Sequence, residues 1–246
     1  MQRPALIFYL APMKLLLSLG LLLLSLPALA QSPLNPRLRH ELDSIRVQDW
    51  RYRKILSRLR EGKEDSLVAA LHLPIDQLVD YAHSHMQRAD SSNLRRVEDI
   101  IWRYGYPGKT LVGRPTNEAA WYILQHSDKI AQYLIWVQNA AEAGELPFYR
   151  YAQMLDRKLM DDGQEQVYGT QWGGYTVLDQ ATGKPHTIAL VWPIKDADKV
   201  DKRRREAGFA TTLAQSVAKI GIPYIPVTLE YALWLQQEAA AFASAR

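Results

Sequence analysis

A histidine beside an apolar segment is the residue of this sequence best suited to acid–base chemistry. His126 follows the apolar run 121–124, stands next to Gln125 and precedes Asp128 by two residues. An imidazole can accept or donate a proton near neutral pH, and a nearby carboxylate can orient it. We therefore identify His126 as a candidate catalytic residue, with Gln125 and Asp128 as candidate substrate contacts. The alternative is a histidine at a helix end that binds free backbone carbonyls.

A second polar pair, Asp156 and Arg157, lies in a predicted helix with an apolar face. Neighbours on a helix diverge by about 100°, so one can point into a cleft while the other forms a salt bridge elsewhere. In a catalytic site, Asp156 would orient His126 or activate water, and Arg157 would hold an anionic substrate group. The alternative for both is an ordinary ion pair at the edge of the core.

Two further segments supply candidate substrate contacts. In a predicted strand, Tyr168 and Gln171 point to opposite faces. Gly169 between them either permits the close approach of a ligand or of another backbone, or marks a bulge. Tyr106 lies in the loop 105–109, which two glycines and a proline interrupt. That loop can form a pocket wall or a rigid connector between helices. We predict Tyr106, Tyr168 and Gln171 as substrate contacts.

No metal site and no cofactor site are predicted. His83 and His85 are two residues apart, so on a helix they point about 200° from one another and cannot share an ion. The chain has no cysteine, and it contains no phosphate-binding loop, dinucleotide fingerprint or nucleophile elbow. The basic run 202–205 has acidic neighbours on both sides, which favours a solvated helix over an anion site.

Helices must position most of these residues. Apolar residues at three- and four-residue steps predict a long helix over 36–60, broken only by the polar Asp49 and ended by Gly62. A second helix is expected from Pro74, followed by a turn at 90–93 and a third helix over 94–104. Helices over 117–126, 129–143 and 147–161 then carry the candidate catalytic residues. Three more are expected near 196–206, near 210–219 and from Thr228.

A change of pattern at Gln164 predicts a small β-structure. The segments 165–170, 175–178 and 187–192 are rich in β-branched and aromatic residues and are separated by glycine-containing turns. The fold class is therefore mainly α (α+β), with a small antiparallel β-hairpin or sheet near 165–193. We expect an N-terminal helical region at 31–90 and a helical core domain at 91–246 that carries the hairpin as an insertion.

The first thirty residues have the parts of a secretory signal peptide. Arg3 and Lys14 precede an apolar run, and the small residues of 28–30 suit a signal peptidase. The run is about a dozen residues, short of the roughly 20 that span a membrane, although an uncleaved anchor is the alternative. Cleavage removes two of 30 basic residues and leaves 28 against 26 acidic ones. We expect a periplasmic or secreted protein without a stable membrane anchor, and its balanced charge argues against nucleic acid as a partner.

Several short runs, in order, carry a family resemblance. They are Tyr-Gly-Tyr-Pro-Gly at 104–108, Gln-His-Ser-Asp at 125–128, Asp-Arg at 156–157 and Tyr-Gly-Thr-Gln at 168–171. From Trp102 to about Gly208 the chain resembles a bacterial family of unknown function. The segment 172–190 departs from that family's pattern as a longer hairpin insertion. The resemblance implies a grouping and no activity.

Three classes of function stay open on these observations. The first is an envelope hydrolase or related acid–base enzyme that uses His126 with Asp156 and Arg157. The second is a non-catalytic module that binds a peptide, a glycan or another small ligand beside the aromatic hairpin. The third is a structural or interaction protein whose long N-terminal helix packs on a partner. The sequence identifies neither a substrate nor an oligomeric state.

Overall fold

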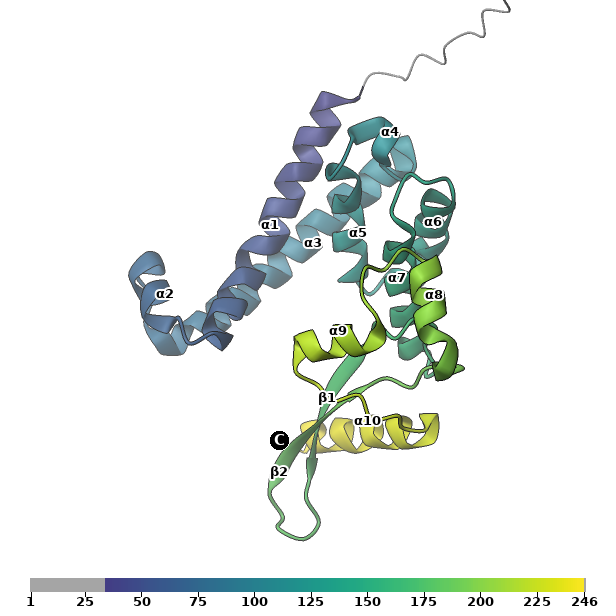
Figure 1. The fold of residues 1–246 in the computed structure, drawn as a ribbon. Coiled ribbons are helices and arrows are strands. Elements are labelled where there is room, and N and C mark those ends of the chain that lie inside the picture. Colours follow the sequence, from purple (N-terminus) through teal and green to yellow (C-terminus); the bar gives the residue numbers. More distant parts are fainter. Residues whose placement is uncertain (1–33, 246) are drawn as a thin grey trace, which may run out of the picture. The chain divides into compact units, whose positions relative to one another are not determined.

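The computed structural model describes residues 34–245, which form helices and one antiparallel hairpin (Figure 1). The helices are α1 (Pro36–Arg60), α2 (Glu64–Leu71), α3 (Leu78–Tyr104), α4 (Lys109–Val112), α5 (Ala119–Gln125), α6 (Ile130–Glu142), α7 (Phe148–Asp161), α8 (Val200–Glu206), α9 (Leu213–Ile220) and α10 (Leu229–Ser244). The strands are β1 (Trp172–Leu178) and β2 (Pro185–Val191), and 3₁₀ turns occur at Ile75–Gln77 (η1), Thr116–Glu118 (η2) and Ala197–Lys199 (η3). The predicted fold class, mainly α with a small hairpin, is confirmed. The predicted signal peptide lies outside the described residues.

The long first helix forms as the sequence predicts. The Asn35 side chain caps it by accepting a hydrogen bond from the Leu38 N–H at 3.0 Å, and Pro36 occupies the first turn. The predicted apolar stripe is the buried face, including Leu42 and the polar Asp49. This face packs on α3 and α5, so the helix belongs to the core in which the candidate residues lie.

The second long helix differs from the sequence-based expectation. The predicted turn at 90–93 is wrong, because α3 runs through these residues without interruption. Asn93 is fully buried and donates a hydrogen bond to the Ile45 carbonyl at 3.4 Å, while Asp90 pairs with Arg53 of α1. Asp90 and Asn93, which are typical turn residues, thus form contacts between α3 and α1. The short helix α2 was not predicted, and the division of the chain at residue 90 stays a prediction.

Helices α5, α6 and α7 confirm the predicted segments to within two residues at each end. Their apolar faces surround Trp121, which is 2% exposed and donates its indole N–H to the Arg150 carbonyl at 2.8 Å. Helix α6 packs on α7, and α5 packs on both α1 and α7. Thus α5 brings its C-terminal His126 toward α1, whereas Asp156 lies in α7.

The β-structure is smaller than predicted. Strands β1 and β2 pair antiparallel with Trp172 opposite Val191 and Leu178 opposite Pro185. The predicted strand at 165–170 is wrong, since this segment is a loop with a single bridge from Gln166 to Ile194. The buried Gln166 fixes the base of the hairpin. Its amide nitrogen donates to the carbonyls of Gln171 and Trp192 at 2.9 and 2.6 Å.

The C-terminal helices cover the hairpin and its neighbouring loop. Thr212 begins α9 with a capping box, and the Thr228 side chain caps α10, as the sequence-based start of the last helix predicts. Helix α10 packs on β1, and α9 packs on α8 (Figure 1). Among residues 34–245, no helix combines the length and apolarity that crossing a membrane requires.

Candidate active site

His126 ends helix α5 and makes contacts through both ring nitrogens. Its Nδ1 lies 3.3 Å from Asp49 Oδ1, and its Nε2 lies 3.1 Å from the Gln125 amide nitrogen. The His126 side chain is 31% exposed, whereas that of Asp49 is 1% exposed. A buried carboxylate therefore holds an imidazole that reaches the surface.

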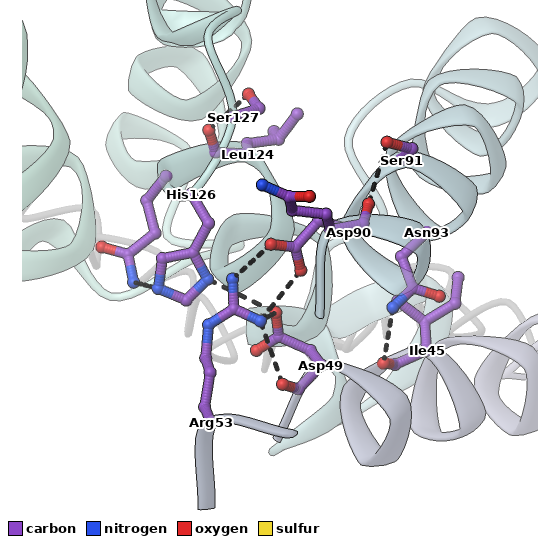
Figure 2. A network of polar contacts seen from close by, with 11 residues as sticks. Ile45, Asp49, Arg53, Asp90, Ser91, Asn93, Leu124, His126 and Ser127 are labelled. Carbon is purple, nitrogen blue, oxygen red and sulfur yellow. Dashed lines mark hydrogen bonds and ion pairs between the residues drawn. The ribbon is translucent and has the colours of Figure 1, made fainter. Parts of the chain in front are cut away.

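Asp49 belongs to a chain of charges that connects three helices. Arg53 contacts Asp49 Oδ1 at 2.7 Å and binds both carboxylate oxygens of Asp90 at 2.9 Å, as Figure 2 shows. One guanidinium thus stands between two carboxylates, and His126 approaches the first carboxylate from α5. Within the described residues, Asp49 Oδ2 is buried and has no hydrogen-bond partner. A buried oxygen without a partner is costly, so its presence calls for an explanation.

The contacts of His126 fit the tautomer of the imidazole that carries its proton on Nδ1. A carboxylate accepts hydrogen bonds only, so Nδ1 carries a proton toward Asp49. The Gln125 amide nitrogen donates only, so it faces the Nε2 lone pair. In this tautomer Nε2 is the basic atom, and the Gln125 amide must turn away before Nε2 can accept a proton from a substrate.

Asp156 has a different environment. It is fully buried, and its two oxygens accept hydrogen bonds from the backbone N–H groups of Val167, Tyr168 and Thr170 at 2.7 to 3.1 Å. The Thr170 hydroxyl adds a further bond at 2.9 Å. Burial raises the pKa of the Asp156 carboxyl, and these hydrogen bonds oppose that effect. Asp156 therefore shapes the loop 167–170.

The loop around Gly169 is closely packed. Gly169 has a φ of +67°, and a Cβ atom here would lie 2.8 Å from a methyl carbon of Leu213 and 2.9 Å from one of Ile194. A glycine is therefore required both by the backbone conformation and by the space available. The close approach expected at this glycine is an approach to apolar side chains.

The structure joins Arg157 to Gln171 and leaves both apart from the His126 network. Arg157 donates to the Gln171 side-chain oxygen at 3.3 Å and lies 3.9 Å from Asp161. Gln171 donates to the Gln153 carbonyl at 3.3 Å. Among the described residues, no hydrogen bond or ion pair connects Asp156, Arg157 or Gln171 with His126.

The other predicted contacts have local roles. The Tyr106 hydroxyl donates to the Asn117 carbonyl at 3.0 Å, and burial raises its pKa. This bond connects the 105–109 loop to η2 and favours the connector interpretation. The Tyr168 ring lies 6.1 Å from the ring of Phe209, and burial raises the pKa of Tyr168. Asp128 is exposed.

Sequence reasoning missed the partner of His126. Asp49 was visible as the one polar residue in the apolar stripe of a long helix, which is the signal that could have identified it. Its contact with His126 spans 77 residues, so no local pattern connects the two. Sequence reasoning also placed Arg204 on a solvated helix face, and this is wrong because Arg204 is 2% exposed.

A family model for a family of unknown function, DUF6624, matches residues 74–218, more than half of the chain. The protein belongs to the DUF6624 family. This confirms the resemblance found in the sequence. No curated protein and no solved structure matches the chain significantly. The DUF6624 segment contains His126, Asp156 and Arg204, while Asp49 lies before it.

Proposed function

We propose that this DUF6624 protein is an exported acid–base enzyme, a cell-envelope hydrolase or a related enzyme, in which His126 transfers protons. The observation that carries the proposal is the contact between the partly exposed His126 ring and the buried Asp49 carboxylate, whose second oxygen has no partner in the described part of the chain. A carboxylate beside Nδ1 orients an imidazole and stabilises the positive charge that forms when Nε2 takes a proton.

The charges around Asp49 support this role. Arg53 contributes one positive charge and Asp49 and Asp90 two negative ones, so the three groups beside His126 carry a net charge of −1. A proton accepted by His126 neutralises the cluster. Asp49 takes the orienting role that the sequence suggested for Asp156, while Arg157, Tyr168 and Gln171 stay predicted substrate contacts.

Export is part of the proposal and has its own test. We expect cleavage after Ala30, so that the mature chain begins at Gln31. The full-length chain would be expressed in a Gram-negative host, and the N-terminus of the periplasmic protein would be sequenced. A protein that keeps residues 1–30, or that stays in the cytoplasm, would contradict export.

The catalytic role is tested with the mature chain and chromogenic substrates. The probes are para-nitrophenyl esters of acetate and phosphate and the para-nitrophenyl glycoside of N-acetylglucosamine. His126→Asn keeps an N–H near the position of Nδ1 and removes Nε2, so we expect a loss of turnover of about 100-fold or more. Asp49→Asn should also lower turnover, because it removes the charge that orients the ring.

The matched control is His186→Asn, a change of the same type at an exposed position in β2. We expect it to retain the wild-type rate, with all variants checked for folding by circular dichroism. Turnover that survives in His126→Asn, or the absence of turnover with every probe, would count against the proposal.

A further inference from the structure

Arg204 is a buried arginine that forms no ion pair with an acidic side chain in the described part of the chain, and the sequence predicted no functional role for it. Arg204 of α8 donates hydrogen bonds to the carbonyls of Tyr168 at 2.8 Å and Thr211 at 3.0 Å. It also donates to the hydroxyls of Thr211 at 3.3 Å and Ser216 at 2.6 Å. The ring of Phe209 lies 4.6 Å from its guanidinium carbon. Each of these partners is uncharged.

The positive charge of Arg204 therefore has no carboxylate in direct contact with it among the described residues. No ion pair of Arg204 occurs among residues 34–245, and the charges of Asp201 and Asp156 act on its pKa without direct contact. Asp201 accepts the backbone N–H of Leu213 at 2.7 Å, and Asp156 is occupied by the 167–170 loop. Burial lowers the pKa of Arg204, although arginine keeps its charge in proteins. Buried charges are normally paired directly, so Arg204 can still form an ion pair with the anionic group of a ligand.

A pocket of about 200 Å³ adjoins this charge. Its polar lining comes from Arg204, Thr211, Ser216, Gln153, Thr170 and Gln171. The volume is smaller than the roughly 300 Å³ at which pockets for drug-sized ligands begin, so it suits a small molecule or one end of a larger one.

Counting donors shows what the pocket can bind. A guanidinium has five N–H groups, and the four bonds described above leave one of them without a partner among residues 34–245. The hydroxyls of Thr211 and Ser216 are 2.8 Å apart, so one donates to the other and a single hydroxyl hydrogen remains. The Gln153 side chain accepts a bond from Arg150 through its oxygen at 3.2 Å, which leaves its NH₂ group to donate. One charged donor, the Arg204 N–H, and two neutral donors, a hydroxyl and an amide, fit an oxyanion.

We propose that this pocket, the Arg204 pocket, binds a small molecule through its carboxylate or phosphate group. Arg204 supplies the charge, and Ser216 with Thr211 and Gln153 supply neutral donors. The wall that carries Gly169 and Thr170 is already held in place by Asp156, so the pocket is formed before the ligand enters. The proposal does not rest on His126 or Asp49, neither of which lines the pocket, although Gln171, a predicted substrate contact, does line it.

The test is a titration of the mature chain with sodium phosphate, sodium sulfate and sodium acetate. Binding is followed by thermal unfolding and by the fluorescence of Trp172, which lines the pocket. Sodium chloride at equal ionic strength corrects for screening. We expect a saturable rise in the unfolding temperature with at least one oxyanion. Preference for acetate would indicate a carboxylate ligand, and preference for phosphate or sulfate a phosphorylated one.

Three variants assign the binding to the pocket. Arg204→Met keeps most of the side-chain volume without the charge, and it should abolish the response. Because the buried guanidinium also holds backbone carbonyls, Ser216→Ala and Gln153→Ala provide milder changes, each expected to weaken binding about tenfold. Lys202→Met removes an exposed charge, 72% accessible, from the same helix and should leave binding unchanged.

The possible results distinguish a failure of the Arg204 pocket proposal from a failure of the proposed enzyme function. His126→Asn should bind the oxyanion as the wild type does, whatever its turnover. Equal responses to chloride and to all oxyanions would overturn the Arg204 pocket. The same conclusion would follow from a saturable response that Ser216→Ala and Gln153→Ala leave unchanged.

Discussion

Replacement of Asp156 by asparagine distinguishes two interpretations of this carboxylate, a catalytic group and a group that stabilises the 167–170 loop. Asparagine has the same shape but presents an NH₂ group in place of one oxygen. If that group replaces Oδ1, the Val167 N–H loses its acceptor, and if it replaces Oδ2, the Thr170 N–H does. Either orientation leaves a buried donor unpaired and facing another donor. A buried group without its partner costs about 1–3 kcal/mol, and bonds to a charged acceptor are stronger than neutral ones. We expect a loss of about 2–4 kcal/mol in the free energy of unfolding.

The assay is urea unfolding of the mature chain at neutral pH, followed by circular dichroism. Asp161→Asn is the matched control, because it makes the same change in α7 at a side chain that is 51% exposed. Its ion pair with Arg157 is long, at 3.9 Å, and we expect a change below about 0.5 kcal/mol.

One result would refute this reasoning. Residues kept for function are often held at a cost to stability, so that their removal is neutral or stabilising. If Asp156→Asn were as stable as the wild type or more stable, the carboxylate would not be holding the loop. The catalytic interpretation of Asp156 would then regain its support.

Three further measurements test the packing and the charges. Gly169→Ala should lower the free energy of unfolding by about 1–3 kcal/mol more than Gly62→Ala does, because both glycines have positive φ while only the first would place a Cβ against packed side chains. Equal losses of free energy in urea unfolding would show that the space around Gly169 can accept a Cβ. The hydrogen bond from Lys129 contributes most to lowering the pKa of Glu98 from its usual value of 4.5. The stability that Glu98 adds is therefore present above pH 4.5 and is lost as the pH falls through the lowered pKa. The stability gap between the wild type and Glu98→Gln should therefore shrink in acid, and a gap that grows would reverse the sign. Thr212→Ala should cost about 1 kcal/mol by thermal unfolding, since it removes the capping box of α9, and no loss would mean that the cap is not formed in solution.

The sequence predicted the elements where local chemistry decides them. Helices α5, α6 and α7 follow the apolar period and the residues that end it, and α1 follows the same rule together with its Asn35 cap. The error at 90–93 arose where local preference and distant contacts disagree. Aspartate, serine and asparagine favour turns, but here burial against Ile45 and pairing with Arg53 keep the segment helical.

The segment 165–170 shows the same limit for a strand. Its β-branched and aromatic residues are typical of a strand, yet its backbone N–H groups bind the Asp156 carboxylate instead of a neighbouring strand. Asp156 lies in a helix eleven to fourteen residues earlier, and nothing in the sequence marks it as the acceptor. The candidate site was limited in the same way, since His126 was identifiable by type but its partner Asp49 only by position in the fold.

The 167–170 loop connects the polar residues that the sequence singled out to the pocket that it did not. Asp156 accepts the backbone N–H groups of Val167 and Tyr168, while Arg203 and Arg204 donate to the carbonyls of the same two residues at 2.8 Å each. Adjacent arginines diverge on a helix, and here they bind neighbouring carbonyls. The loop is therefore held by a carboxylate on its donors and by two guanidinium groups on its acceptors. In this arrangement the Asp156 oxygens bind the backbone, and Asp156 acts on Arg204 only without direct contact. The pocket beside Arg204, rather than Asp156, is therefore the place where a ligand's anionic group can form a direct ion pair.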